Sequence, residues 1–213
     1  MIRVKVCGLN EPSNVSAISK AGPDFIGFIF YPGSKRFVGE HPDIMLFRNV
    51  SSKIKKTGVF VNEDLQKVLD LALYADLDAI QLHGDESVNY CNFFRKSGFS
   101  VIKTFGVGPG FDPEITDRYS DVCDYFLFDT KTEHYGGSGE KFSWSILNNY
   151  QFKKPFFISG GIGPEDAGII GSVLNPQFYG VDVNSRFEVM PGVKDAIKIK
   201  KFIYELKNIK YEF

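Results

Sequence analysis

The feature that most constrains this chain is a regular alternation of strand-like and helix-like runs. Eight short runs rich in β-branched and aromatic residues recur about every 25 residues, each followed by a longer, more polar stretch. Strands that alternate with helices indicate a parallel sheet built from right-handed crossovers. Eight such units in 213 residues predict an α/β fold, a single-domain (β/α)8 TIM barrel that spans residues 1–213. The alternative is an open, doubly wound sheet, which rarely needs eight even units, and no GxGxxG motif follows the first strand.

The predicted elements follow from these runs. The strands are RVKVCG (3–8), DFIGFIF (24–30), KTGVFVN (56–62), LDAIQLH (77–83), SVIKTFG (100–106), YFLFDT (125–130), PFFISGG (155–161) and FYGVDVN (178–184). Helices are predicted for 11–22, 63–75, 86–98, 163–174 and 192–208, from helical apolar spacing or from start and stop signals. The stretch 41–56 is also expected to contain a helix, although its pattern is the weakest.

The composition bears on partners and location. Acidic and basic residues nearly balance, 26 against 25, so the chain lacks the basic surplus typical of nucleic-acid-binding domains. It contains no run of 18 apolar residues, so no membrane span is expected. No secretory leader is expected either. Three widely spaced cysteines do not resemble a disulfide framework, which favours a reducing, cytoplasmic location.

Polar side chains share one face of four predicted strands. Lys5 and Cys7 alternate with valines in the first strand, and His83 ends an alternating run in the fourth. Asp129 in the sixth strand and Asp182 in the eighth also alternate with apolar neighbours. Because barrel enzymes place their active sites at the carboxyl ends of the strands, these side chains are expected to converge at the barrel mouth.

Cys7 and Asp129 are the candidate proton-transfer groups. The ordinary pKa is about 8.5 for a thiol and about 3.9 for an aspartic acid. A base near neutral pH needs a lowered thiol pKa, which a cationic Lys5 would supply unless a carboxylate takes up its charge. An acid needs a raised carboxyl pKa, which burial would supply. The competing interpretations are a cysteine that packs as a small apolar residue and an aspartate that only caps a turn.

Three loops carry candidate binding residues. Gly160 and Gly161 follow the seventh strand, and Asn184 and Ser185 follow the eighth. Glycine-rich turns let backbone N–H groups approach an anion, and these two loops of a barrel often bind phosphate. Arg36, in YPGSKRFV after the second strand, suits a carboxylate because its guanidinium donates two parallel hydrogen bonds. The competing interpretations are glycines that only turn the chain and a solvated basic turn.

The remaining features give expectations about metal binding, loop mobility and core packing. His83 is a possible base without metal partners, and no Cys/His spacing typical of zinc occurs, so no metal is expected. The run TKTEHYGGSGEKFSW after the sixth strand predicts a mobile lid, or else an ordinary flexible loop. Trp144 at its end is expected to anchor packing, and Cys91 and Cys123 are expected in the core.

In combination the motifs resemble the phosphoribosylanthranilate isomerase family of tryptophan biosynthesis. They lie in order along nearly the whole chain: KVCGLN, GFIFYPGSKRFV, TGVFVNE, QLHGDES, LFDT, HYGGSGEKFSW, SGGIGPED and VDVNSRFE…PGVKD. The resemblance implies a barrel that uses no cofactor and acts on a small phosphosugar–anthranilate substrate. The implied reaction is the Amadori rearrangement of N-(5-phosphoribosyl)anthranilate to 1-(2-carboxyphenylamino)-1-deoxy-D-ribulose 5-phosphate, an intramolecular aldose–ketose isomerisation.

The resemblance also implies roles for the candidate residues. Asp129 would be the general acid that protonates the ribose ring oxygen, and Cys7 the general base that removes the proton from C2. Arg36 would hold the anthranilate carboxylate. The remaining implied pocket residues are His83, Asp182, and the phosphate-binding turns at Gly160–Gly161 and Asn184–Ser185.

One departure from the family concerns the turn after the eighth strand. The family often has SSG there, whereas this chain has NSRFE. Arg186 therefore either adds a contact to the phosphate or pairs with Glu188 and leaves phosphate binding to the backbone.

Two other functions compete with the isomerase. Another phosphosugar barrel, such as an indole-glycerol-phosphate synthase or a histidine-pathway isomerase, is expected to lack the pairing of Cys7 with Asp129. A catalytically silent barrel that serves as a binding subunit is the other alternative, and the joint presence of Cys7, Arg36 and Asp129 argues against it. The motifs do not determine the oligomeric state, for which a monomer is favoured.

Overall fold

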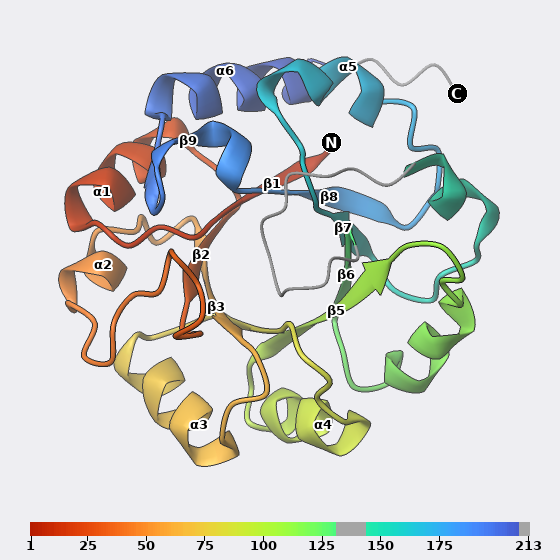
Figure 1. Cartoon of the computed structure of the whole chain (residues 1–213), viewed down its shortest axis with the longest axis horizontal. Helices are drawn as coiled ribbons and strands as arrows, with labels where there is room; N and C mark the ends of the chain where they lie inside the picture. The colour runs from red at the N-terminus through yellow and green to blue at the C-terminus, as the bar shows by residue number, and fades with distance from the viewer. Residues whose placement is uncertain (131–143, 209–213) are drawn as a thin grey trace.

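Eight parallel strands close into a barrel in the computed structural model, which describes residues 1–130 and 144–208 (Figure 1). Each strand pairs with the next along the chain, and β8 returns to pair with β1. The predicted (β/α)8 fold is therefore confirmed. The strands are β1 (Arg3–Cys7), β2 (Phe25–Ile29), β3 (Lys55–Phe60), β4 (Ala79–Leu82), β5 (Ser100–Val107), β6 (Tyr125–Thr130), β7 (Phe156–Ile158) and β8 (Phe178–Val183).

Helices surround the barrel (Figure 1). Their ends follow the expected local signals: Pro12 begins the first helix, and Gly22 ends it in the left-handed conformation with a φ of 76°. The carboxylates of Asp64 and Asp195 accept backbone hydrogen bonds at the starts of two others. The α-helices are α1 (Pro12–Ala21), α2 (Met45–Arg48), α3 (Leu65–Tyr74), α4 (Val88–Lys96), α5 (Ala167–Ile170) and α6 (Ala196–Lys207).

Two predicted helices are much shorter than expected. Only α2 forms within 41–56, and the stretch 163–174 forms η3 (Pro164–Asp166) followed by the four-residue α5. Gly168 and Gly171 lie in the latter stretch, and glycine is a poor helix former because of its backbone entropy. After β5 and β6 the chain forms the 3₁₀ segments η1 (Pro113–Tyr119) and η2 (Trp144–Asn149) instead of α-helices.

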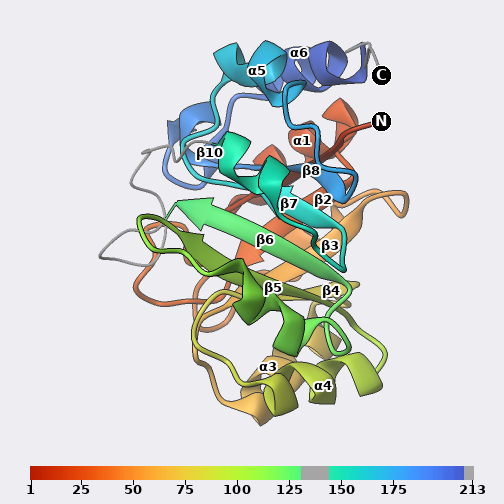
Figure 2. The ribbon, with the colours of Figure 1, turned by 90° about the vertical axis from the view of Figure 1, so that its right-hand side faces the viewer.

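The interior of the barrel changes from apolar to polar along the strands. An apolar cluster fills the part of the interior toward the beginnings of the strands. In it, Phe25 and Phe157 are in edge-to-face contact at 5.3 Å between ring centroids. Two residues further along a strand, side chains return to the same face. Five inward positions therefore follow that cluster toward the end of the barrel where the arrowhead of β6 lies (Figure 2). They are Gly27, Gln81, Thr104, Asp129 and Ser159.

Aspartates directly before three even-numbered strands fasten the opposite end of the barrel. Each carboxylate accepts a backbone N–H from the beginning of the preceding strand, and each aspartate's own N–H donates to the carbonyl of that same residue. These paired bonds satisfy backbone groups where strands enter the sheet. The pairs are Asp24 with Val4 at 2.9 Å, Asp78 with Lys56 at 2.8 Å and Asp124 with Val101 at 2.8 Å.

A small hairpin follows the barrel sheet. After β8 and η4 (Ser185–Phe187), the strands β9 (Glu188–Met190) and β10 (Val193–Lys194) pair antiparallel before α6. The side chain of Asn14 on α1 donates to the carbonyl of Lys194 at 2.8 Å and accepts its N–H at 2.8 Å. The N–H of Asn10 donates to the carbonyl of Gly192. The hairpin is thereby fastened to the loop after β1 and to α1.

No helix within residues 1–130 and 144–208 is long and apolar enough to cross a membrane. The assignment of the whole chain to one domain stays a prediction.

Candidate active site

The first and last strands of the barrel bring a buried ion pair together with the candidate base. Lys5 Nζ lies 3.0 Å from Asp182 Oδ2, and both side chains are buried. Cys7 follows on the same inward face and is only 4% exposed. A Cβ at Gly27 on the adjoining strand would lie 2.7 Å from the Cys7 sulfur and 3.1 Å from Lys5 Nζ. Glycine at this position therefore provides the space that the thiol and the ammonium occupy.

The environment of Cys7 differs from the expectation of a lowered pKa. Burial raises the pKa of the Cys7 thiol, the charge of Lys5 opposes this, the charge of Asp182 adds to it, and the net direction is upward. Burial lowers the pKa of Lys5, but Asp182 and Cys7 together outweigh burial, so the net direction is upward and the lysine stays charged. The condition set on Lys5 therefore decides the outcome: burial chiefly raises the pKa of Cys7, and Lys5, whose charge is paired with Asp182, does not outweigh it.

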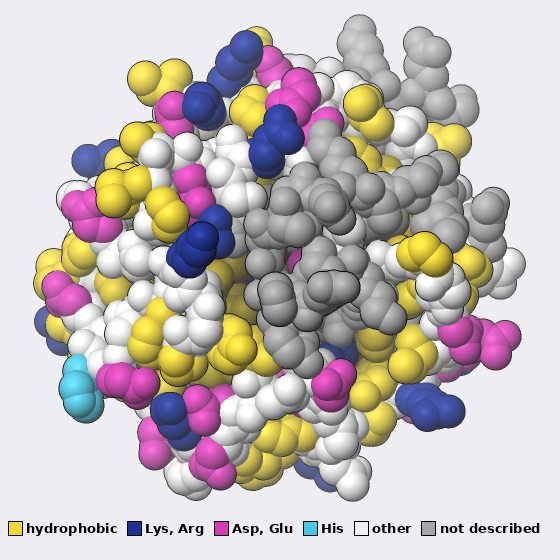
Figure 3. Space-filling view, viewed as in Figure 1, with side chains coloured by type: hydrophobic (Ala, Val, Ile, Leu, Met, Phe, Trp, Pro, Cys, Tyr) yellow, Lys and Arg dark blue, Asp and Glu magenta, His cyan; other side chains and the backbone are white. Residues whose placement is uncertain are grey.

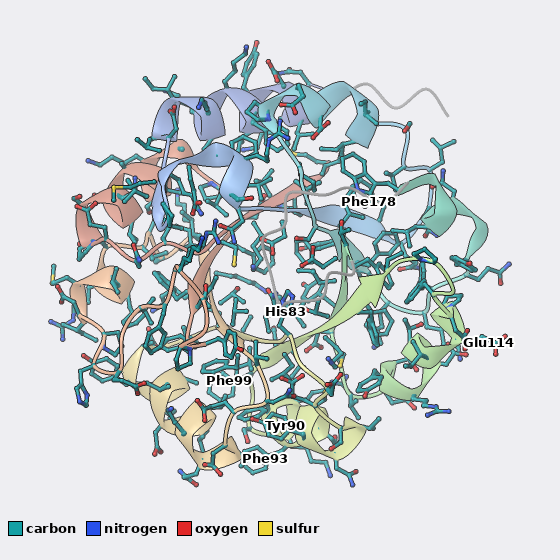
Figure 4. The ribbon with its side chains drawn as sticks, viewed as in Figure 1. His83, Tyr90, Phe93, Phe99, Glu114 and Phe178 are labelled. Atoms are coloured by element: carbon teal, nitrogen blue, oxygen red, sulfur yellow. The ribbon has the colours of Figure 1, made fainter. Side chains whose placement is uncertain are left out.

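Asp129, the candidate acid, ends the inward face of β6 beside His83. Its Oδ2 lies 3.4 Å from His83 Nε2, and its Oδ1 accepts the backbone N–H of Thr130 at 2.9 Å. The amide nitrogen of Gln81 lies 3.0 Å from Nδ1 of His83. An amide nitrogen can only donate, so Nδ1 accepts and the ring proton sits on Nε2, facing Asp129. Figure 4 shows His83 near the centre of the barrel.

Asp182 connects the surroundings of the two candidate groups. Burial raises its pKa, Lys5 opposes the rise, and the charges of Asp129 and His83 also act on it. The pKa of Cys7 in turn depends on the charges of both Lys5 and Asp182. The inward polar residues predicted from strand alternation thus form two pairs, Lys5 with Asp182 and His83 with Asp129, whose charges act on one another.

Arg36 is held by an acidic residue from the hairpin. Its Nε and Nη2 donate to the two carboxylate oxygens of Glu188, each at 2.7 Å. Gly8, with a φ of 77°, lies beneath the arginine, where a Cβ would come within 2.7 Å of Arg36 Cδ. The expected alternative pairing of Arg186 with Glu188 is therefore wrong. Burial raises the pKa of Glu188, but Arg36 and Lys194 outweigh burial and leave it lowered.

The loops after β7 and β8 are linked by a different ion pair. Arg186 Nη2 lies 2.5 Å from Glu165 Oε1, and both side chains are about half exposed. Gly160 and Gly161 both have positive φ, 90° and 64°. Because Glu165 lies shortly after the two glycines, the ion pair ties the glycine turn to the turn that begins at Asn184. Ser185 opens the 3₁₀ segment of the latter turn.

Two buried residues that hold the loop after β4 were not recognised as such in the sequence. Glu86 is 5% exposed and accepts the N–H of Gly84. Lys103 donates to Glu86 at 3.2 Å and to the carbonyl of Gly84 at 2.6 Å. This buried network fixes the loop that directly follows His83. Lys103 itself, a lysine at an outward position of an otherwise apolar strand, was the signal in the sequence that could have revealed this network.

The remaining expectations concern core residues, the loop after β6 and metal binding. Trp144, Cys91 and Cys123 are buried, as predicted. The predicted lid lies almost entirely in 131–143, outside the described residues. Within the described ranges, no three His, Cys, Asp or Glu side chains group as a metal site requires. Figure 3 shows acidic and basic side chains mixed over this face.

Comparison with known proteins adds independent information. Residues 4–205 match the family model for N-(5′-phosphoribosyl)anthranilate isomerase. A protein of that name from Parabacteroides distasonis is 45% identical over 204 residues, covering 95% of this chain and 92% of the relative. One from Thermotoga maritima is 37% identical over 210 residues, covering 98% of this chain and all of the relative.

Solved structures agree with the sequence relatives. The crystal structure of phosphoribosyl anthranilate isomerase from Thermotoga maritima superposes with a TM-score of 0.86 at 36% identity, covering 98% of this chain and 100% of that chain. A structure of such an enzyme in complex with reduced 1-(o-carboxyphenylamino)-1-deoxyribulose 5-phosphate gives a TM-score of 0.84 at 34% identity, with the same coverage. The chain therefore belongs to the N-(5′-phosphoribosyl)anthranilate isomerase family.

Proposed function

We propose that this chain rearranges N-(5-phosphoribosyl)anthranilate to 1-(2-carboxyphenylamino)-1-deoxy-D-ribulose 5-phosphate by general acid–base catalysis, as a step of tryptophan biosynthesis. One observation carries the assignment of roles. The thiol of Cys7 and the carboxyl group of Asp129 lie on inward faces at the same end of the barrel, beside the pairs Lys5–Asp182 and His83–Asp129, whose charges act on one another.

Asp129 starts the reaction as the general acid. It donates a proton to the ribose ring oxygen while the lone pair of the anthranilate nitrogen expels that oxygen from C1. The ring opens and an iminium ion forms between the nitrogen and C1. The Nε2 proton of His83, 3.4 Å from Asp129, then stabilises the carboxylate that remains.

Cys7 completes the rearrangement as the general base. Its thiolate takes the proton from C2, and the C–H bonding pair forms a double bond between C1 and C2 and neutralises the iminium ion. The resulting enolamine tautomerises to the ketone. Tautomerisation moves the proton of the C2 hydroxyl to C1, and no step needs an external electron donor or acceptor, so the proposed reaction uses no cofactor.

Both ends of the substrate are anions, and the loops around the mouth offer groups for each. Glu188 occupies Nε and one N–H of Nη2, so the remaining guanidinium N–H groups of Arg36 are assigned to the anthranilate carboxylate. The phosphate is assigned to the backbone at Gly160–Gly161 and Asn184–Ser185, with Arg186 at the edge. His83 and Asp182 line the pocket between the two ends.

The direct test replaces each proton-transfer group. Cys7→Ser and Asp129→Asn should each lower kcat by about 10²–10⁴-fold, since each removes one proton transfer. The substrate is generated in situ and its fluorescence followed, and circular dichroism confirms that each variant is folded. Cys91→Ser, which alters a buried cysteine of α4, is the matched control and should keep kcat. Wild-type kcat in either catalytic variant would refute the roles.

We further propose that the protein is a monomer. Light scattering after size exclusion should then give 24.0 kDa. One related solved structure concerns monomers generated from the dimeric Thermotoga maritima enzyme, so a mass near twice that of the chain is the outcome that would contradict a monomer.

A further inference from the structure

Lys194 has a position that its place in the chain does not explain. It lies in β10, after the barrel is complete, yet its side chain is fully buried. Its backbone is held on both sides by Asn14, through hydrogen bonds of 2.8 Å. The hairpin is thus fastened by its backbone, and the ammonium group is not needed for that purpose.

The ammonium of Lys194 instead contacts two residues of the proposed substrate site. Its Nζ lies 2.5 Å from Glu188 Oε1 and 2.6 Å from Asn184 Oδ1. Glu188 passes this restraint to Arg36 through two hydrogen bonds of 2.7 Å. Asn184 opens the turn assigned to the phosphate. One buried cation therefore restrains the groups assigned to both anionic ends of the substrate.

The charge balance makes Lys194 essential to this arrangement. Glu188 is mostly buried and lies between two cations, Lys194 and Arg36. Without Lys194 the carboxylate is neutralised by the arginine alone, and Asn184 Oδ1 loses its charged donor. The guanidinium then binds Glu188 more strongly and is less available to a substrate carboxylate.

We propose that Lys194 is a positioning residue that, through Glu188 and Asn184, sets Arg36 and the β8 turn for the carboxylate and the phosphate of one substrate. The proposal rests on the function proposed above. It assigns no proton transfer to Lys194.

Titration of Lys194 offers a readout that a purely structural role would not show. The charged or titratable groups that face it are Glu188 on β9, Arg36 after β2 and Cys7 at the end of β1. Burial lowers the pKa of Lys194 to about 8, with Glu188 opposing the shift. Above that pH the ammonium is lost, so the KM for phosphoribosylanthranilate should rise in the wild-type enzyme.

The experiment measures kcat and KM between about pH 6.5 and 9.5 for wild type and Lys194→Met. Hydrogen bonds to charged groups contribute enough that the variant should have a KM about ten-fold higher near neutral pH. Its KM should not rise further above pH 8, and its kcat should fall by a smaller factor. Lys200→Met, at an exposed position of α6, is the control and should match wild type at every pH.

Combining Lys194→Met with Arg36→Met tests whether Lys194 acts through Arg36. The KM increases of Lys194→Met and Arg36→Met should combine to less than their product, since both disturb the same carboxylate contact. If Lys194→Met does not fold, Lys194→Gln, which keeps a hydrogen-bond donor but removes the charge, replaces it; its KM should exceed that of wild type at neutral pH and should not rise further above pH 8. A wild-type KM profile in the variant, or a fully multiplicative combination with Arg36→Met, would overturn the proposal. Absence of turnover in wild type would instead refute the proposed function.

Discussion

At the scale of single residues, each proposed functional side chain depends on a partner that controls its charge or its orientation. Lys5 pairs with Asp182, Gln81 orients His83, and Glu188 holds Arg36. The sequence indicated these side chains as candidates, because strand alternation is a local property. It did not predict most of their partners, because Arg36 and Glu188 are 152 residues apart and only folding brings them together.

The raised pKa of Cys7 predicts how the turnover rate depends on pH. A base must be deprotonated, so a pKa above the ordinary value means that the thiolate fraction still increases beyond about pH 8.5. We expect kcat to increase with pH through this range, as measured with saturating substrate. A kcat that stays constant from pH 7 to 10 would contradict the assignment of Cys7 as the base.

Arg186 provides a prediction about the phosphate subsite. If it contacts the phosphate, Arg186→Ala should raise KM about three- to ten-fold and leave kcat nearly unchanged. Glu165→Gln, which removes the other half of the exposed ion pair, serves as the comparison and should not raise KM. An unchanged KM in Arg186→Ala would mean that the arginine serves only the ion pair, and little stability would be lost because exposed pairs contribute about 0–1 kcal/mol.

At the scale of elements, strands were predicted within one or two residues of most of their observed ends, whereas helices varied. Helices with caps and helical apolar spacing, such as α1 and α3, formed as predicted. The stretches 41–56 and 163–174 shortened because glycine, proline and irregular spacing weaken local helix formation. Backbone hydrogen bonds between neighbouring strands hold the barrel together, so the barrel forms even where the surrounding helices are short.

The aspartates directly before β2, β4 and β6 give a prediction about stability. Asp78→Ala removes the acceptor for the Lys56 N–H at 2.8 Å and should lower the free energy of unfolding by about 0.5–1.5 kcal/mol. Urea denaturation measures the change. Asp70→Ala, which alters only an exposed hydrogen bond within α3, should change it by less than about 0.5 kcal/mol. Equal effects of the two substitutions would contradict a special role for Asp78.

At the scale of the whole molecule, closure of the barrel joins the first strand to the last. Pairing of β1 with β8 places Lys5 beside Asp182, although 177 residues separate them. Closure therefore creates the charge environment of Cys7 as well as completing the sheet. An open sheet with the same strands would leave the lysine without its partner.

This joint role predicts a large effect of removing one partner. Lys5→Met leaves Asp182 buried without a counter-charge and should lower the free energy of unfolding by about 3–5 kcal/mol. The double variant Lys5→Met/Asp182→Leu, which removes both charges, should recover part of that loss. If the loss of unfolding free energy in the double variant equals the sum of the losses in the two single variants, the two residues are not coupled.

The sequence by itself determined the barrel, the order of its strands, their inward faces and the family. Repeat length, alternation and local motifs depend only on neighbouring residues, so they can be read along the chain. The tertiary structure alone decided that Asp182 takes up the charge of Lys5, that Glu188 holds Arg36 rather than Arg186, and that Lys194 reaches the mouth. Those outcomes depend on which distant side chains share a buried space, because burial and charge pairing act through distance in space and not along the sequence.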